Sequence, residues 1–148
     1  MLFRSLAVFD RLAEAEGLAH RTPAAKVHFH ELGSLDSLVD VVGTVLGCHL
    51  LGVEALYVSA INVGSGTIKS EHGVIPAPGP ATAALLKGLP VYAAGPRFEL
   101  TTPTGAALMA TLSAGAGSMP AMTVTSIGYG AGEADPPGWP NEIGRAHV

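Results

Sequence analysis

The chain has 148 residues, of which 48% are hydrophobic and 14% are charged, so it is a globular sequence and not a disordered polyelectrolyte. Its formal net charge of −4 at pH 7 combines 8 basic with 12 acidic residues. That balance leaves no broad basic surface to neutralise a nucleic-acid backbone, and DNA and RNA binding are therefore not expected.

The first part of the chain predicts a helix followed by a short strand. Apolar residues recur at helical spacing over residues 2–16, with Phe3 and Leu6 on the apolar face and Gly17 as the stop. Such an amphipathic helix needs a partner face. Side chains alternate over Lys26–His30, which is typical of a short strand.

A second helix and a second strand are expected next. Residues 34–37 offer N-cap side chains, and Gly52 can end the helix in a left-handed conformation. The apolar stretch 38–53 is shorter than the roughly 20 residues that a bilayer requires, so it predicts a buried helix and no membrane span. Residues 55–63 are apolar and β-prone, which predicts a largely buried strand.

Glycine and proline residues are frequent in the next part of the chain. Residues 64–79 predict a loop of defined shape. Pro80 suits the first position of a short helix and Gly88 suits its end, which is the expected asymmetry of these two residues. Residues 89–92 can then form a strand.

A further helix and a further strand are expected in the last part of the chain. Thr102 as N-cap and Pro103 at the first position predict a helix that reaches Leu112. Residues 122–127 alternate like a strand, and the glycines of 128–132 are expected to turn it away. Because helices and strands alternate without a run of hairpin turns, we expect an α/β fold of mixed helix and strand layers, with a strand order that the sequence leaves open.

The densest group of polar side chains lies between His28 and Asp40. If residues 27–30 are extended, His28 and His30 point to the same face. Asp36 and Asp40 are four residues apart and share one helix face. Imidazoles and carboxylates together suit a divalent metal. The alternative is that Asp36 favours the helix start through the dipole, Asp40 is solvated, and the histidines are hydrogen-bonded edge residues.

Two glycine- or threonine-containing turns are candidates for an anion site. Gly64–Thr67 follows a strand and can direct N–H groups at a phosphate, although no helix follows it at once. Thr101–Gly105 combines hydroxyls with the positive end of a helix, and ordinary N-capping is the alternative interpretation. Lys69, Glu71 and His72 lie in a glycine-flanked segment that can present an acid, a base or a ligand, or serve only as a polar connector.

The order of these motifs resembles one family. The segments that carry the resemblance are 27–43, 64–67, 72–73, 76–82, 102–107 and 128–132. Together they are similar to the nickel insertion protein of the nickel-pincer cofactor pathway, the cofactor of lactate racemase. The resemblance runs from about Phe3 to Asn141.

That resemblance implies an enzyme of the lyase class, working in the cytoplasm. It would insert nickel into pyridinium-3,5-bisthiocarboxylic acid mononucleotide, forming nickel–carbon and nickel–sulfur bonds. The family depends on CTP with manganese or magnesium, and its product goes to lactate racemase or a similar enzyme. A homo-oligomer is an open option. A nickel carrier or storage module without chemistry, and a metal-dependent hydrolase, are the alternatives.

The resemblance also implies roles for individual residues. Nickel ligands would be His28, His30, Glu31, Asp36 and Asp40, with His72 as a further choice. The base that removes a ring proton would be Glu31 or His72. The substrate phosphate would be held by Gly64, Ser65, Gly66, Thr67, Thr102, Thr104 and Gly105.

The chain departs from the family pattern at both ends. The family's N-terminal strand with its glycine-rich loop and its C-terminal CTP-binding region are not recognisable here. We therefore expect residues 1–141 to be an internal fragment, inactive by itself, with an exposed apolar face near Leu2–Phe9. Ile143–Val148 resembles a translated sequencing adapter, and residues 142–148 are predicted to be a non-native tail.

Overall fold

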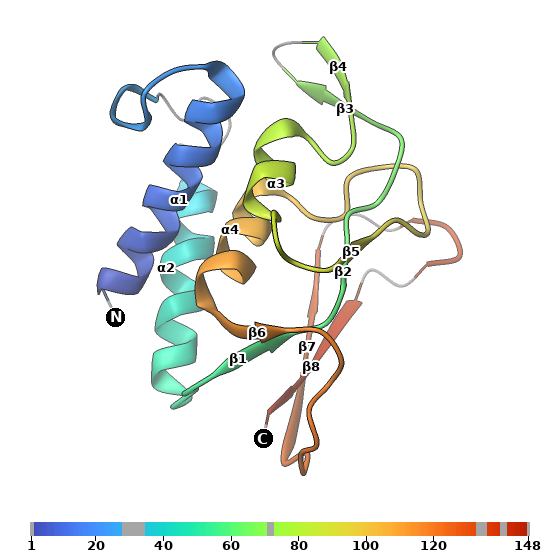
Figure 1. Ribbon diagram of the computed structural model, residues 1–148. Coiled ribbons are helices and arrows are strands. Elements are labelled where there is room, and N and C mark those ends of the chain that lie inside the picture. Colours follow the sequence, from blue (N-terminus) through green and yellow to red (C-terminus); the bar gives the residue numbers. More distant parts are fainter. Residues whose placement is uncertain (1, 28–34, 71–72, 133–135, 140–141, 148) are drawn as a thin grey trace. The chain divides into compact units, whose positions relative to one another are not determined.

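The computed structural model of the protein describes residues 2–27, 35–70, 73–132, 136–139 and 142–147. The chain forms two compact units, residues 1–117 and 118–148, and each is described by itself. The predicted mixed α/β class is confirmed. The helices of the described residues all lie in the first unit: α1 (Leu2–His20), the 3₁₀ turn η1 (Ala24–Lys26), α2 (Leu35–Leu50), α3 (Pro80–Leu85) and α4 (Pro103–Leu112) (Figure 1).

The strands are short and pair two by two. In the first unit β1 (Leu56–Val58) pairs in parallel with β6 (Ser113–Ala116), β2 (Ile61–Asn62) in parallel with β5 (Val91–Tyr92), and β3 (Thr67–Ser70) antiparallel with β4 (Gly73–Pro76). In the second unit β7 (Ser126–Ala131) pairs antiparallel with β8 (Glu142–His147). None of the described helices is long and apolar enough to cross a membrane.

The strand predictions are only partly right. The prediction of one buried strand over residues 55–63 is wrong, because the segment forms two strands, β1 and β2, that pair with different partners, β6 and β5. The loop expected between residues 64 and 79 contains a β-hairpin, since Ile68 lies opposite Ile75 in an antiparallel register. Lys26 lies in a 3₁₀ turn and not in a strand, whereas the rest of the strand predicted after Val27 falls outside the described residues.

In the second unit the predicted strand is displaced along the chain. The strand runs over Ser126–Ala131, so Gly128 and Gly130, two of the glycines expected to end it, lie within it. Glycine has a low β-propensity, but hydrogen bonding to β8 outweighs that local preference.

Helix α1 is longer than predicted and buries a different face. It passes through Gly17 and ends at His20. A β-carbon at Gly17 would lie 2.6 Å from the carbonyl oxygen of Thr22, so this glycine allows the following turn to pack against the helix. Ser5, Val8, Leu12 and Ala15 form the buried face, whereas Phe3 and Leu6 are 85% and 48% exposed. The expected exposed apolar side chains near the start of α1 are therefore present.

Helix α2 has the predicted C-terminal end. Gly52 has a φ of +67°. Its N–H donates to the His49 carbonyl at 3.1 Å, and the Val53 N–H donates to the Cys48 carbonyl at 2.9 Å. This is the Schellman arrangement, which satisfies the last carbonyls of a helix through a left-handed residue.

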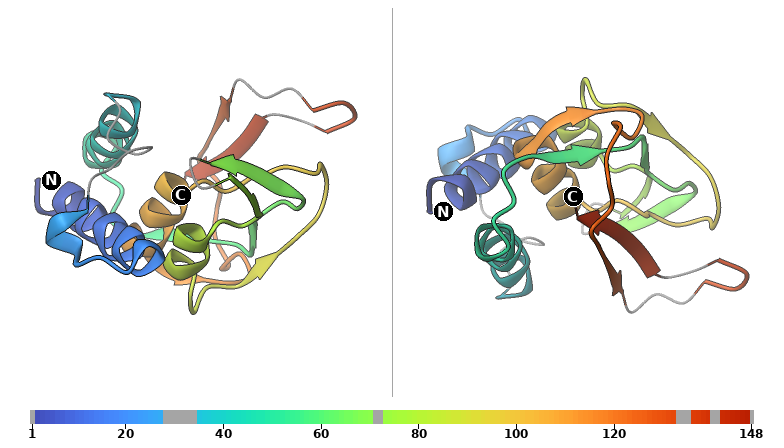
Figure 2. Two further views of the ribbon diagram at one scale, coloured as in Figure 1. Left: turned by 90° about the horizontal axis from the view of Figure 1, so that it is seen from above. Right: turned by 90° about the horizontal axis from the view of Figure 1, so that it is seen from below.

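The prediction that α2 is buried is wrong for half of its surface. Its buried residues are Ser37, Val41 and Val45. The rest of its surface carries exposed apolar residues, namely Leu35, Leu38, Val39, Leu46 and Leu50. Both views of Figure 2 show α2 at the edge of the helical layer.

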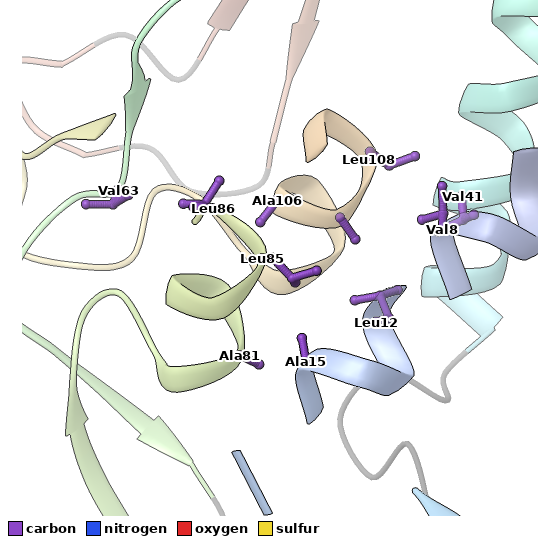
Figure 3. Close-up of a cluster of buried hydrophobic side chains, with 11 residues drawn as sticks. Val8, Leu12, Ala15, Val41, Val63, Ala81, Leu85, Leu86, Ala106 and Leu108 are labelled. Atoms are coloured by element: carbon purple, nitrogen blue, oxygen red, sulfur yellow. The ribbon is translucent and has the colours of Figure 1, made fainter. Parts of the chain in front are cut away.

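The core of the first unit lies between α1, α3 and α4. Figure 3 shows Leu12 and Ala15 of α1 facing Ala81 and Leu85 of α3, with Ala106 of α4 beside them. Small side chains allow these helices to approach closely, and the Arg11 guanidinium of α1 donates to the Ala110 carbonyl of α4. Packing in this core therefore fixes the positions of α3 and α4. The loops described next lead into the first residues of these two helices.

Candidate functional site

Three connecting segments meet beside the β3–β4 hairpin. We call them together the loop junction: residues 62–66, which begin with the last residue of β2, residues 77–79 between β4 and α3, and residues 94–101 before α4. Backbone hydrogen bonds join them: Ser65 N to Phe98 O at 3.2 Å, Leu100 N to Val63 O at 3.3 Å, and Ala77 N to Gly66 O at 3.0 Å. Three motifs that are far apart in the sequence are thus brought to one place.

The Asn62 side chain is a hub of the loop junction. Its Oδ1 accepts from the N–H groups of Gly64 and Ala94, both at 3.1 Å. Its Nδ2 donates to the Ala94 carbonyl at 3.0 Å, and its own carbonyl accepts from the Thr101 hydroxyl at 2.7 Å. Sequence analysis did not single out Asn62, because a polar residue at the end of a short strand has no signal of its own.

Gly64 allows a close approach of two chain segments. Its φ of +75° lies in the left-handed region that favours glycine. A β-carbon there would lie 2.1 Å from the Phe98 carbonyl oxygen and 2.9 Å from the Leu100 nitrogen. The glycine is thus required by the contact with the segment before α4.

The turn formed by Gly64, Ser65, Gly66 and Thr67 is predicted to bind phosphate, but two of its N–H groups donate to other residues of the protein. The Gly64 N–H donates to Asn62, and the Ser65 N–H donates to Phe98. Neither is available to a phosphate while these bonds persist. The phosphate role of this turn stays a prediction, and Gly66 and Thr67 are the residues that remain for it.

The start of α4 has the predicted N-cap. The Thr102 side-chain oxygen accepts from the Gly105 N–H at 3.3 Å, and Pro103 occupies the first helical position. Thr104 is only 8% exposed. These contacts favour the capping interpretation of Thr102, Thr104 and Gly105, and their binding of phosphate stays a prediction.

Thr102→Ala is expected to lower the free energy of unfolding by about 1 kcal/mol, because it removes the cap of α4. Thr102→Ser keeps the hydroxyl and is the matched control, with a loss of less than half as much. Urea unfolding of both variants is the measurement. Equal stability of wild type and Thr102→Ala would contradict the capping role.

The predicted nickel ligands are only partly within the described residues. Asp36 and Asp40 are exposed on the first turns of α2 and share one face of it, as expected. His28, His30, Glu31 and His72 lie outside the described residues. Within the part of the chain that the structure describes, no three His, Cys, Asp or Glu side chains form a metal-binding group. The ligand set therefore stays a prediction.

Glu99 is a loop-junction residue that the sequence did not reveal. Its Oε1 accepts from the Thr82 hydroxyl at 3.4 Å, and Thr82 is fully buried in α3. Its backbone forms an antiparallel bridge with Gly64. The segment around Glu99 has no periodicity, so only the fold shows that this carboxylate meets α3.

Gly79→Ala is expected to raise the free energy of unfolding by about 0.5–1 kcal/mol. Gly79 has a φ of −63°, which alanine adopts without strain. A β-carbon would lie 3.6 Å from the terminal methyls of Ile68 and Ile75, which is ordinary contact. Thermal unfolding tests this, and a lowered melting temperature would contradict it.

Comparisons with known proteins agree with one another. The sequence model of the family described as "Nickel insertion protein" matches residues 2–146. A relative from Nocardioides sp., named pyridinium-3,5-bisthiocarboxylic acid mononucleotide nickel insertion protein, is 51% identical over 139 residues, which are 94% of this chain and 35% of the relative.

Relatives from Syntrophobacter fumaroxidans and Gloeothece citriformis, whose names also refer to nickel insertion, are each 51% identical over 90% of this chain. The chain spans 35% and 33% of their lengths, about a third of the curated relatives that it matches. No solved structure matches it.

Proposed function

Because the chain belongs to the nickel insertion protein family, we propose that it is the nickel-handling part of an enzyme that inserts nickel into pyridinium-3,5-bisthiocarboxylic acid mononucleotide. The observation that carries this proposal is the match over nearly the whole chain, together with the name of the Nocardioides relative. Two motifs that resemble the family support it further, namely the Gly64–Thr67 turn directly before β3 and the Thr102–Gly105 turn, whose neighbour Thr101 donates to the Asn62 carbonyl at 2.7 Å.

In this proposal nickel is a substrate, held by donors that can release it. His28, His30 and Glu31 supply imidazole and carboxylate ligands, and borderline ligands of this kind suit Ni²⁺. Asp36 and Asp40 add negative charge on the following helix. A cation that must be transferred needs ligands that exchange, so mixed nitrogen and oxygen donors fit the task better than a closed thiolate site.

Carbon–nickel bond formation also needs a base. The ring C–H bond breaks, its electron pair forms the nickel–carbon bond, and its proton passes to Glu31 or His72. The two thiocarboxylate sulfurs bind nickel beside that carbon. Gly66, Thr67 and the residues that begin α4 are the candidates to hold the phosphate of the mononucleotide.

Further properties belong to the same proposal. CTP with manganese or magnesium would be bound by a C-terminal region of a longer protein, and the enzyme would be a cytoplasmic lyase that supplies lactate racemase or a similar enzyme. Residues 1–141 alone would then bind nickel without turnover. We also propose that residues 142–148 are a non-native tail, whose removal would leave nickel binding unchanged.

The His28→Ala/His30→Ala double variant, made in a full-length protein that contains this chain, is expected to bind nickel at least tenfold more weakly and to lose insertion in proportion. A matched control removes two other histidines, His20 and His49, which are exposed on α1 and α2. Nickel binding by calorimetry and conversion of the mononucleotide are the measurements. Unchanged affinity in the double variant would refute the ligand assignment.

A nickel carrier without chemistry is the second candidate, since the same ligands permit it. The full-length protein, mixed with nickel, CTP and the thiocarboxylate mononucleotide, distinguishes the two. A new nickel–carbon bond, seen by mass spectrometry and nuclear magnetic resonance, supports the enzyme. Release of nickel without that bond would instead support the carrier.

A further inference from the structure

We propose that Glu99 is a positioning residue of the insertion site: the hydrogen bond from Thr82 to its carboxylate fixes the loop junction and the β3–β4 hairpin against α3. The proposal deepens the proposed function and rests on it for the consequence in activity. Its structural part, the link between α3 and the hairpin, can be tested without nickel.

The first step is the side-chain contact between α3 and the segment before α4. The Thr82 hydroxyl donates to Glu99 Oε1 at 3.4 Å, and the Thr82 side chain has no exposed surface. A buried hydroxyl loses its hydration, so an acceptor inside the protein is needed to compensate it. Thr82 belongs to the helix that packs against α1 and α4, which makes it a rigid point of attachment.

The backbone around Glu99 pairs with the turn after β2. It bridges Gly64, while the residues on either side of Glu99 accept from Ser65 N–H and donate to the Val63 carbonyl. Glu99 thus belongs to a short backbone pairing with the turn after β2. Through its side chain and its main chain, one residue joins α3 to that turn.

The β3–β4 hairpin is attached to the same turn. Strand β3 begins at Thr67, directly after the turn, and the Gly66 carbonyl accepts from Ala77 N–H at the other end of the hairpin. The Ile68 and Ile75 methyls would lie 3.6 Å from a β-carbon at Gly79, and Glu99 Oε1 would lie 4.0 Å from it. The hairpin side chains and the carboxylate therefore border the same buried glycine.

This arrangement predicts that hydrogen-bond geometry matters more than charge. Glutamine at position 99 keeps an oxygen acceptor for Thr82, whereas alanine removes it. Valine at position 82 keeps the shape of threonine without the hydroxyl, and serine keeps the hydroxyl. Glu99→Gln and Thr82→Ser are thus the conservative variants, and Glu99→Ala and Thr82→Val are the disruptive ones.

The experiment compares these four variants and the Glu99→Ala/Thr82→Val double variant in the full-length protein. Amide hydrogen exchange in β3 and β4 should be about tenfold faster in both disruptive variants, with exchange in α4 unchanged. The nickel-insertion rate should fall about tenfold in each. Because each disruptive variant removes the same Thr82–Glu99 hydrogen bond, the double variant should lose about tenfold and not a hundredfold. Glu99→Gln and Thr82→Ser should resemble wild type in both measurements.

Wild-type hairpin exchange in Glu99→Ala would overturn the proposal. So would a Glu99→Gln variant as impaired as Glu99→Ala beside an active Thr82→Val, because that pattern would assign the role to charge. A wild-type protein that forms no nickel–carbon bond would refute the proposed function alone, since the exchange measurements would still decide whether Glu99 holds the hairpin.

Discussion

Gly64→Ala is expected to destabilise the first unit by about 4 kcal/mol or more, which is enough to unfold many domains of this size. Two costs add. Alanine at a φ of +75° costs about 1–2 kcal/mol, because its β-carbon crowds the following carbonyl. In addition, the β-carbon would lie 2.1 Å from the Phe98 carbonyl oxygen, so the paired backbone must separate.

Separation of that backbone has further consequences. The Ser65 N–H to Phe98 and Leu100 N–H to Val63 hydrogen bonds both depend on the approach at Gly64. Urea unfolding followed by circular dichroism measures the loss in the free energy of unfolding. A midpoint within experimental error of wild type would contradict the geometry of the loop junction.

Gly43→Ala is the matched control for Gly64→Ala. Gly43 lies inside α2, and a β-carbon there meets no atom within 4 Å. Alanine has the higher helix propensity, so this variant should gain about 0.5–1 kcal/mol of stability. The same substitution is thus expected to have opposite signs at two positions, depending only on backbone conformation and neighbours.

Asn62→Ala is expected to lower the free energy of unfolding by about 3 kcal/mol. The variant loses three side-chain hydrogen bonds, one with Gly64 and two with Ala94. Their partly buried backbone partners would be left without an acceptor or donor inside the protein. This cost exceeds that of an exposed polar truncation, because the orphaned groups keep their desolvation penalty.

Two variants set the scale for Asn62→Ala. Asn62→Asp retains an acceptor for Gly64 and Ala94 N–H but loses the donor to the Ala94 carbonyl, so an intermediate loss is expected. Ser65→Ala removes only a 3.5 Å contact to the Pro96 carbonyl, and we expect a loss below about 1 kcal/mol. The order Asn62→Ala, Asn62→Asp, Ser65→Ala in denaturant midpoints checks the hub role. Any other order would contradict it.

Local sequence rules predicted a helix end correctly where a single residue specifies that end. The N-cap at Thr102 and the left-handed end at Gly52 both appear as predicted. These are contacts within a few residues, so neighbouring side chains and backbone preferences are sufficient to specify them. Gly17 shows the limit of the same reasoning, because its contact with Thr22 decides that the helix continues.

The candidate site was predictable as motifs but not as an arrangement. The Gly64–Thr67 and Thr102–Gly105 turns were recognised from their residue types. The contact of the first turn with the segment before α4, through Asn62 and Glu99, was not, since both residues act across more than 15 positions of chain. Such long-range partners leave no periodic trace in a single sequence.

By itself, the amino-acid sequence determined the mixed α/β class, the helix ends with local caps and the family to which the chain belongs. Only the tertiary structure decided which face of α1 and α2 is buried, that Thr67–Ser70 pairs antiparallel with Gly73–Pro76, and that Glu99 meets Thr82. The physical reason is that an apolar period restricts the choice of face, whereas burial depends on the other elements that pack there. Strand pairing likewise depends on partners distant in the chain, which local propensity does not contain.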